Sequence, residues 1–263
     1  MTPLLVIDIG NTRTACGLFA DGKIAALTHF ERFSQRELKA FLKGKEYYGC
    51  VFASVVPAAS DSFNCFWCRR GRGPLCRLNW TIVSKALKNK IKVFGSQPGD
   101  DRAANAYLLH KLGNFPAVSV DAGTALTTEV LDGKGVFLGG LIAPGAFLQR
   151  ESLSGRTAQL KGLAKGKPAL IGSSSETAIS AGVEGLLTMG LTSWLAEVEK
   201  EVLGESFKSI VFTGGGAELY FKEAKKLFKP VVFDPLFTLK ALALSFFDED
   251  MRKLYSKLQK VVF

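Results

Sequence analysis

A short apolar run that ends in Asp and continues into Gly and Thr occurs twice in this chain. The first copy, VIDIGNT, spans residues 6–12, and the second, VSVDAGT, spans residues 118–124. Glycine lets the backbone approach a phosphate without a Cβ in the way, and such a turn aims N–H groups at an anion. The carboxylate can hold a hydrated cation against the phosphates, and the Thr hydroxyl adds a hydrogen bond. The repeat therefore predicts two related halves that face one nucleotide.

Composition is typical of a globular protein and gives no sign of export. The chain has 263 residues, of which 47% are hydrophobic and 22% are charged, as in ordinary globular domains. No apolar stretch approaches the roughly 20 residues of a membrane span. Met1-Thr2-Pro3 carries no basic segment, and Asp8 interrupts the first apolar run, which disfavours a signal peptide. We expect a cytoplasmic protein with no membrane partner.

The charge balance suits several kinds of partner. There are 34 Lys and Arg against 24 Asp and Glu, a net charge of +10, which fits nucleic acid, an anionic membrane surface or a polyanionic substrate. The basic residues do not alternate with aromatic residues, as a platform for single-stranded nucleic acid requires. We interpret them as solvated faces and expect no nucleic-acid partner, with nucleic-acid binding as the minor alternative.

The cysteines allow two interpretations. Their number is five, which is odd, and a chain of this length does not need disulfides. Cys50, Cys65, Cys68 and Cys76 are near one another in sequence, and Cys65 and Cys68 have the spacing of metal ligands. A second C-x-x-C is absent, and Cys50 falls in a predicted buried strand, which disfavours zinc. Reduced, partly buried thiols are the favoured interpretation.

Alternation of apolar residues and turn signals predict the order of elements in the first half. Ser34 and Glu37 form a predicted capping box at the start of a helix. The predicted strands are 4–8, 14–19, 23–30 and 49–56, the predicted helices are 34–42, 61–70 and 101–112, and 71–74 is a loop.

The second half repeats this opening order. Strands are predicted at 117–121, 125–131, 135–142, 209–212 and 230–233, and helices at 146–153, at 176–203, after 216 and at the C-terminus. A hairpin trio followed by alternating helices and strands predicts an α/β fold in which each half is a mixed sheet flanked by helices. A boundary near Gly113 to Pro116 gives domains of residues 1–115 and 116–263.

This arrangement resembles the superfamily of actin, sugar kinases and Hsp70-type ATPases, in which two duplicated actin-like (ribonuclease H-like) domains close on ATP. Within it the chain resembles the type III pantothenate kinases, bacterial enzymes that phosphorylate pantothenate in the first step of coenzyme A synthesis. The motifs that carry the resemblance follow the family's order over most of the chain: DIGNT at 8–12, SVVP at 54–57, GDDR at 99–102 with Asn105, DAGTA at 121–125, GGLIAPG at 139–145, Thr157-Ala158, Ile171-Gly172 and TGG at 213–215.

The resemblance implies that ATP, Mg²⁺ and a monovalent cation, K⁺ or NH₄⁺, serve as cofactors. Phosphoryl transfer depends on positioning and charge neutralisation more than on covalent work by the protein. The first turn would hold the ATP phosphates, with Asp8 binding Mg²⁺ through water. An ordinary hairpin is the alternative, since Gly-Asn is common in turns, but the recurrence of the turn disfavours it. The residues implied in nucleotide binding are Asp8, Ile9, Gly10, Asn11, Thr12, Arg13, Thr14, Ala15, Thr124, Gly214 and Gly215.

By the same resemblance, Asp101 is the general base that accepts the proton of the substrate hydroxyl. Arg102 would neutralise substrate or phosphoryl oxygens, which a permanently charged planar fork does well. Gly99 and Asp100 belong to the implied substrate site. The alternative is that the two Asp residues cap the helix that begins there; we favour catalysis for Asp101 and capping or solvent exposure for Asp100.

In the second half, Asp121 matches the family's ligand for the monovalent cation, and Thr124 would bind the ATP phosphates. A cation there offsets charge where carboxylates and polyphosphate converge. Gly214 and Gly215 leave a strand and enter a helix, so they could admit adenine or the α-phosphate. A flexible connector between strand and helix is the alternative for these glycines.

Three positions depart from the family pattern. Glu129 stands where the family usually has Asp, and Ser175 stands where it has a substrate-binding Thr. The family's substrate-contacting Tyr has Phe94 as its nearest counterpart here, in a shortened segment. Loss of that hydroxyl would weaken recognition in a site built around its hydrogen bond.

The resemblance also implies a homodimer, because the family builds its substrate pocket at a dimer interface, with pantothenate and ATP as ligands. The departures keep a second function open, namely a non-catalytic or altered-substrate nucleotide-binding accessory protein on the same scaffold. Converging Asp8, Asp101 and Asp121 argue against a nucleic-acid surface, since carboxylates repel phosphates unless cations intervene.

Overall fold

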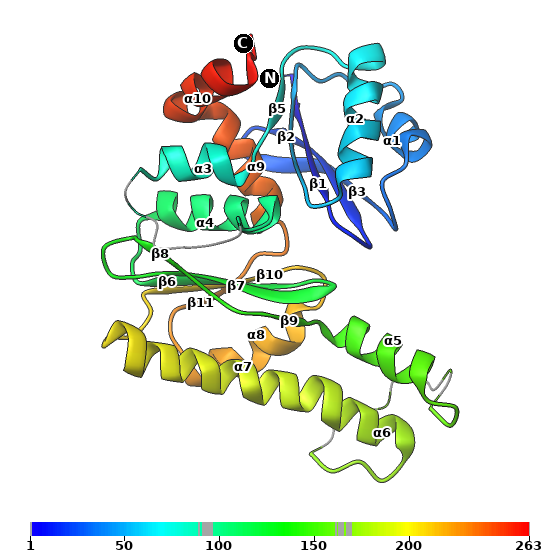
Figure 1. Ribbon diagram of the computed structural model, residues 1–263, viewed down its shortest axis with the longest axis vertical. Coiled ribbons are helices and arrows are strands. Elements are labelled where there is room, and N and C mark those ends of the chain that lie inside the picture. The colour runs from blue at the N-terminus through cyan, green and yellow to red at the C-terminus, as the bar shows by residue number, and fades with distance from the viewer. Residues whose placement is uncertain are drawn as a thin grey trace. The chain divides into compact units, whose positions relative to one another are not determined.

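The computed structural model describes residues 2–88, 90, 97–160, 162, 166 and 170–262 (Figure 1). The chain forms two compact units. Unit 1 comprises Met1–Gly113 and Leu236–Phe263, and unit 2 comprises Asn114–Pro235. This division differs from the predicted domains of residues 1–115 and 116–263, because the C-terminal segment from Leu236 packs with unit 1.

Unit 1 is built on a five-stranded mixed sheet. Its strands are β1 (Leu4–Ile9), β2 (Thr14–Ala20), β3 (Lys23–Phe30), β4 (Cys50–Ser54) and β5 (Leu75–Arg77). They lie in the order β3-β2-β1-β4-β5. The β1–β2 and β2–β3 pairs are antiparallel, whereas β4 is parallel to both β1 and β5. The predicted hairpin at Asp21-Gly22 is confirmed, and both residues have positive φ angles (50° and 78°), as a tight hairpin turn requires.

Helices cover both faces of this sheet (Figure 1). They are α1 (Gln35–Leu42), α2 (Pro57–Arg70), α3 (Trp80–Ala86), α4 (Asp100–Leu112), α9 (Phe237–Phe247) and α10 (Glu249–Gln259). Alternate residues of β1 point to opposite faces. Leu5 and Ile7 pack in one core cluster with Leu38 of α1 and Phe63 of α2, and α9 contacts β1, β2 and β4.

Unit 2 repeats the sheet order of unit 1. Its strands are β6 (Ala117–Ala122), β7 (Ala125–Leu131), β8 (Phe137–Gly139), β9 (Ile142–Pro144), β10 (Ser209–Thr213) and β11 (Val231–Phe233). The order is β11-β10-β6-β7-β8, and β9 also pairs with β7. β6 is antiparallel to β7 and parallel to β10. Two mixed sheets with the same order confirm the predicted fold class.

The helices of unit 2 are α5 (Ala146–Arg156), α6 (Ser175–Ser180), the π-helical turn η1 (Ala181–Gly185), α7 (Leu186–Glu197), the π-helical turn η2 (Val198–Leu203) and α8 (Ala217–Leu227). α6 to η2 are continuous, which confirms the long helix predicted at 176–203. α7 and α8 lie on one side of the sheet (Figure 1). There Leu191 and Leu195 of α7 and Tyr220 of α8 share a core cluster with Val118 and Phe212.

Several predicted elements need correction. The single strand at 135–142 is two strands, β8 and β9, and the closing helix is two helices, α9 and α10. The sequence analysis missed β5 and α3, which are short. The Ser34 half of the predicted capping box of α1 is confirmed, since the Glu37 N–H donates to Ser34 Oγ at 3.3 Å. Among the described helices, none combines the length and apolar character needed to cross a bilayer.

Candidate active site

The turn between β1 and β2 is tight and presents three side chains to solvent. The Gly10 N–H donates to the Arg13 carbonyl oxygen at 2.9 Å. A Cβ on Gly10 would lie 2.9 Å from that same oxygen, so this close approach requires glycine. The side chains of Asn11, Thr12 and Arg13 are exposed. The β1–β2 turn is therefore tight, and its tip is accessible.

The strand residues beside this turn differ in burial. Asp8 is half-buried and lies opposite Ala15 in the β1–β2 register. The side chains of Ile9 and Thr14 are fully buried, and Thr14 Oγ1 has no hydrogen-bond partner among the described residues. Of these residues, Asp8 can offer a side-chain oxygen to a cation, whereas Ile9 and Thr14 can reach a nucleotide only through their backbone.

We expect Thr14→Val to raise the free energy of unfolding by about 1 kcal/mol, because an unsatisfied buried hydroxyl costs roughly 1–3 kcal/mol. Valine has nearly the same shape as threonine, so it should fit at position 14, which lies opposite Ile9 in the β1–β2 pair. Urea denaturation measures the change, and Thr14→Ser, which keeps the hydroxyl and loses the methyl group, serves as the control and should be less stable. A lower stability of Thr14→Val would contradict the prediction and show that the hydroxyl has a partner in the folded protein.

A short packed path joins the β1–β2 turn to the start of α4 within unit 1. Ile9 lies opposite Ser54 in the parallel β1–β4 pair, and the Val55 N–H donates to the Ile9 carbonyl at 3.2 Å. A Cβ on Gly99 would lie 2.9 Å from Val55 Cγ1 and 2.6 Å from Asp101 Oδ1. The SVVP segment and Gly99 thus bring Asp101 to the same edge of the sheet as the predicted phosphate turn.

Asp101 lies in the first turn of α4, with its carboxylate partly withdrawn from water. Its Oδ1 accepts a hydrogen bond from the Arg102 N–H at 2.7 Å. Burial raises the pKa of Asp101 above its usual value, and the hydrogen bond and positive charge of Arg102 offset this only in part. A raised pKa makes a carboxylate a stronger base toward a hydroxyl proton. The environment of Asp101 therefore suits a general base.

Asp100 has a different role from its neighbour. It is buried, and the Arg77 Nε donates to its Oδ2 at 2.9 Å while Arg77 Nη2 donates to the Ser54 carbonyl at 3.2 Å. Gly99 is the N-cap of α4 and makes no side-chain cap bond; among the two Asp residues, Asp101 accepts a first-turn N–H, that of Arg102. For Asp100, both the predicted capping and the predicted solvent exposure are therefore wrong. Asp100 and Arg77 instead tie α4 to β4 and β5, and no local pattern in the sequence pairs them.

The second turn meets the glycine-rich segment that follows β10. β6 and β10 are parallel, and Asp121 lies opposite Thr213. Gly214 has φ +88°, and a Cβ on it would lie 2.4 Å from Asp121 Oδ1. The Gly216 N–H donates to the Ala122 carbonyl at 2.9 Å, and Gly215 is exposed. These contacts pack the segment against Asp121 and Ala122.

The second turn also fixes the start of α5. The Gly145 N–H donates to the Thr124 carbonyl at 2.9 Å, and a Cβ on Gly145 would lie 2.4 Å from the Gly123 carbonyl oxygen. Thr124 itself is half-buried. Within unit 2, the structure therefore brings together Asp121, Thr124 and Gly214, and it joins them to α5.

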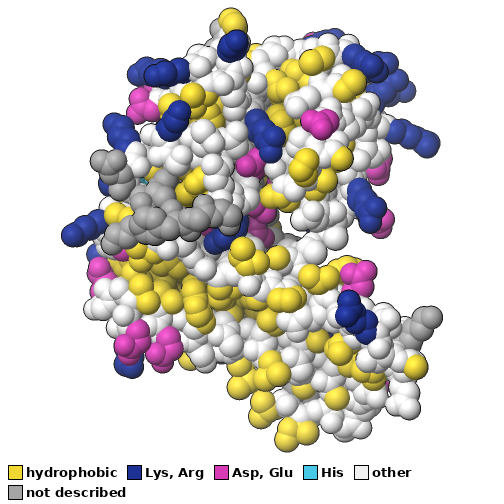
Figure 2. Space-filling view, in the orientation of Figure 1, with side chains coloured by type: hydrophobic (Ala, Val, Ile, Leu, Met, Phe, Trp, Pro, Cys, Tyr) yellow, Lys and Arg dark blue, Asp and Glu magenta, His cyan; other side chains and the backbone are white. Residues whose placement is uncertain are grey.

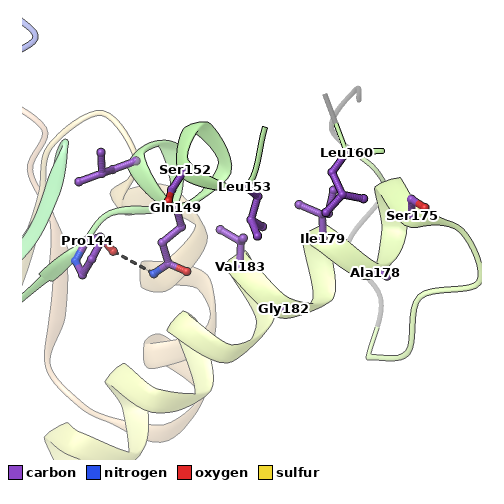
Figure 3. Close-up of a pocket in the computed structure, with 11 residues that line it drawn as sticks. Pro144, Gln149, Ser152, Leu153, Leu160, Ser175, Ala178, Ile179, Gly182 and Val183 are labelled. Atoms are coloured by element: carbon purple, nitrogen blue, oxygen red, sulfur yellow. Dashed lines mark hydrogen bonds between the residues drawn. The ribbon is translucent and has the colours of Figure 1, made fainter. Parts of the chain in front are cut away.

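An apolar pocket of about 750 Å³ lies between α5 and the α6–η1 segment (Figure 3). Leu153, Ile179 and Val183 line it, and Gln149 Nε2 donates to the Pro144 carbonyl at 3.0 Å at one end. Ser175, the first residue of α6, lies toward the other end (Figure 3) and is exposed. The predicted substrate residue Ser175 thus belongs to a pocket of unit 2.

A buried ion pair, missed by the sequence analysis, joins the two walls of this pocket. Arg150 Nε and Nη2 of α5 donate to the two carboxylate oxygens of Glu184 in η1 at 2.8 and 2.6 Å, and Nη2 also donates to Ser180 Oγ at 2.7 Å. Glu184 is 4% exposed, so this bidentate pair is shielded from solvent and strong. No short-range motif links two residues so far apart in sequence.

Other predicted residues fall outside these groups. Glu129 is fully buried, and Ser119 Oγ donates to its Oε2 at 2.6 Å. Phe94 lies outside the described residues. Cys50 is buried as predicted, and Cys65 and Cys68 are exposed. In the part of the chain that the structure describes, no three His, Cys, Asp or Glu side chains are grouped to hold a metal ion.

Comparison with known proteins identifies the family. The family model of type III pantothenate kinases matches residues 4–191. The chain belongs to this family. A type III pantothenate kinase of Methylacidiphilum infernorum is 34% identical, with 92% of this chain and 87% of that protein covered. One from Moorella thermoacetica is 29% identical, with 92% and 97% covered.

Solved structures support the fold of this type III pantothenate kinase family member. A Baf family protein from Campylobacter jejuni superposes with a TM-score of 0.60 at 17% identity, covering 98% of this chain and 100% of that one. The activator of 2-hydroxyisocaproyl-CoA dehydratase from Clostridium difficile, with bound ADPNP, gives 0.52 at 10% identity, covering 99% and 98%. Likeness at such low identity speaks to the fold alone.

Proposed function

We propose that this chain transfers the γ-phosphoryl group of ATP to the primary hydroxyl of pantothenate, with Asp101 as the general base. Membership of the type III pantothenate kinase family supports the reaction. The observation that carries the assignment of the base is the environment of Asp101, whose burial raises its pKa at the edge of the sheet beside the β1–β2 turn. The product is 4'-phosphopantothenate, in the first step of coenzyme A synthesis.

The protein's own residues supply positioning and proton transfer. Asp101 takes the proton from the hydroxyl as the oxygen attacks phosphorus, and Arg102 offsets negative charge on the phosphoryl or substrate oxygens. The Arg77–Asp100 pair holds the N-terminal end of α4 in place. Gly99 and Asp100 hold the backbone that positions Asp101. Ser175 offers a hydroxyl group to the substrate. Phe94 offers an aromatic ring to it.

ATP and Mg²⁺ fit the donors present in unit 1. Asn11, Thr12 and Arg13 offer exposed side chains to the phosphates. Gly10, whose N–H is used within the turn, lets the phosphates approach the backbone without a Cβ in the way. The backbone of Ile9, Thr14 and Ala15 lies behind them. Mg²⁺ usually keeps several waters and needs only one or two carboxylates besides substrate phosphates. Asp8, half-buried at the strand end, suits such water-mediated binding. Mg²⁺ would neutralise the charge that develops on the phosphates during transfer.

A monovalent cation fits the donors present in unit 2. Asp121 is half-buried, and its Oδ1 is backed by Gly214. A single carboxylate suits a weakly held monovalent ion such as K⁺ or NH₄⁺ better than a small dication, which requires a fixed octahedral shell. We assign Thr124 to the phosphates and Gly214 and Gly215 to the adenosine side of ATP.

A coupled assay of ADP formation tests the proposal. We expect turnover that requires both ATP and pantothenate, depends on Mg²⁺, and rises when K⁺ or NH₄⁺ is added. Mass spectrometry of the product should show the addition of one phosphoryl group to pantothenate. ATP binding without pantothenate-dependent ADP formation under either cation would contradict the proposal and favour the non-catalytic accessory protein.

We also propose a cytoplasmic homodimer. Its support is the apolar surface of unit 2, where Phe147 and Leu186 are each 65% exposed and Met189 is 54% exposed. Figure 2 shows hydrophobic side chains on the outer face of the long helix that contains α7. Exposed apolar area of this kind is typical of an interaction surface. Sedimentation equilibrium should give the mass of a dimer, and Leu186→Asp should shift it toward the monomer; a monomeric wild type at micromolar concentration would contradict the proposal.

A further inference from the structure

Two exposed thiols lie on α2, outside every residue group assigned above. Cys65 and Cys68 are free and exposed, whereas Cys16, Cys50 and Cys76 are buried. Burial raises the pKa of each of these three buried thiols, and so suppresses the thiolate, which is the form that binds metals. Thiol chemistry of the folded protein is therefore concentrated at Cys65 and Cys68.

The packing of α2 keeps these two side chains together on its outer face. The inner face is anchored by aromatic residues: the Phe63 ring lies 4.9 Å from that of Phe52, and the Trp67 ring lies 5.7 Å from that of Tyr47. The helix is continuous over Pro57–Arg70. Residues three apart in an α-helix are neighbours on one face, so Cys65 and Cys68 stand side by side toward solvent.

Their spacing decides between a direct disulfide and a bridged pair. Helix neighbours of this kind have Cβ atoms about 5–6 Å apart, but a disulfide needs about 3.5–4.5 Å between Cβ atoms. A single metal ion between two sulfurs, at about 2.3 Å per bond, holds the sulfurs up to roughly 4.6 Å apart. The regular helix therefore accommodates a one-atom bridge without unwinding and disfavours the S–S bond.

We propose that Cys65 and Cys68 form a two-thiolate site for a soft monovalent cation of the Cu(I) class. Thiolates select soft ions, and in the described part of the chain no further His, Cys, Asp or Glu completes the four-ligand shell that zinc requires. Binding releases two protons and changes no oxidation state. Two thiolates and one monovalent ion leave one negative charge, and Arg69 follows Cys65 by one helical turn, where its positive charge is favourable.

The test is a titration of the reduced, full-length protein with Cu(I) under anaerobic conditions, against a chromophoric Cu(I) chelator. We expect one tightly held ion per chain, and at least a 100-fold loss of affinity in both Cys65→Ser and Cys68→Ser, because each removes one of two ligands. The double variant keeps the three buried thiols and should show only weak binding. Its kinase activity should match that of the wild type.

Thermal unfolding provides a second readout, since an ion that bridges the outer face of α2 should raise the Tm of the wild type and leave that of the double variant unchanged. Wild-type affinity in either single variant would overturn the proposal. So would tight binding in the double variant, an ion that joins two chains by sedimentation, or zinc bound as tightly as Cu(I).

Discussion

Asp101→Asn should lose about 10²- to 10⁴-fold in kcat, the usual contribution of a general base, while the protein folds normally. The amide keeps the shape of the side chain, and its oxygen can still accept the Arg102 N–H that Asp101 Oδ1 accepts at 2.7 Å. It cannot take a proton from the substrate hydroxyl. Steady-state kinetics should therefore show a fall in kcat with little change in the KM for ATP.

The raised pKa of Asp101 also predicts that Asp101→Asn, which lowers activity, does not lower the stability of the protein. Because burial raises this pKa in the folded protein, the folded state holds the proton more tightly than the unfolded state, and stability falls as the pH rises through the raised value. At neutral pH the charged carboxylate therefore costs folding free energy. Asp101→Asn removes that cost and should unfold at the same or a higher urea concentration than the wild type at pH 7.

This pairing of lost activity with retained or higher stability separates a catalytic residue from a structural one. Asp250→Asn is the matched control, since Asp250 is exposed and only 3.6 Å from Lys253 Nζ at the surface; it should change neither quantity. The acid limb of the pH–rate profile should lie above the usual carboxyl range, for the same reason that the pKa is raised. Near wild-type turnover of Asp101→Asn would exclude Asp101 as the base.

Local sequence patterns predicted much of this fold because strands and tight turns depend on residues that are adjacent in the sequence. The strands β1, β2 and β3 of unit 1, the strands β6 and β7 of unit 2 and the Asp21-Gly22 turn follow from alternation of apolar residues and from turn chemistry. The strand at 135–142 was wrong because β8 and β9 are separated where a Cβ on Gly140 would lie 1.9 Å from the Thr128 carbonyl oxygen. That close backbone approach depends on a neighbouring strand and has no local sign beyond the glycine pair itself.

The packing of the C-terminal helices with unit 1 is partly indicated by the sequence. α9, with the sequence FTLKALALSFF, buries residues on nearly every side, among them Phe237, Leu242 and Phe246. A helix that is apolar all round is enclosed by other elements, and here α9 contacts both α4 and the sheet of unit 1. The pattern indicated burial, but the sequence alone does not say which core receives the helix.

The ion pairs that support the candidate site residues are not indicated by any local pattern in the sequence. Arg77–Asp100 and Arg150–Glu184 join residues that are distant in sequence, and they form because the fold buries carboxylates that need compensation. Asn105 belongs to a motif of the resemblance, yet it is 1% exposed and accepts a hydrogen bond from Thr238 of α9 at 2.9 Å. The spacing of the motifs located these segments in the sequence. The role of each residue within them could be assigned only from its packing in the fold.

Gly214→Ala should both destabilise unit 2 and disturb the proposed cation site. At φ +88° an alanine is strained, which costs about 1–3 kcal/mol, and its Cβ would lie 2.4 Å from Asp121 Oδ1 and 2.8 Å from the Ala122 carbonyl oxygen. Relief of that clash must move the carboxylate. We therefore expect a lower free energy of unfolding and, in the kinase assay, a weaker activation by K⁺ or NH₄⁺ that higher cation concentration partly restores.

Gly204→Ala is a control that separates the effect of backbone strain from the effect of the steric clash with Asp121. Gly204 has a similar left-handed conformation, φ +68°, but a Cβ there would meet no atom within 4 Å. This control should therefore lose stability through backbone strain alone and keep the wild-type dependence on the cation. If Gly214→Ala lost no more stability than Gly204→Ala and showed the same activation by cation, the packing of Gly214 against Asp121 would have no part in holding that carboxylate. If cation activation falls only in Gly214→Ala, the second Asp-x-Gly-Thr turn depends on the glycine segment after β10 for the position of its carboxylate.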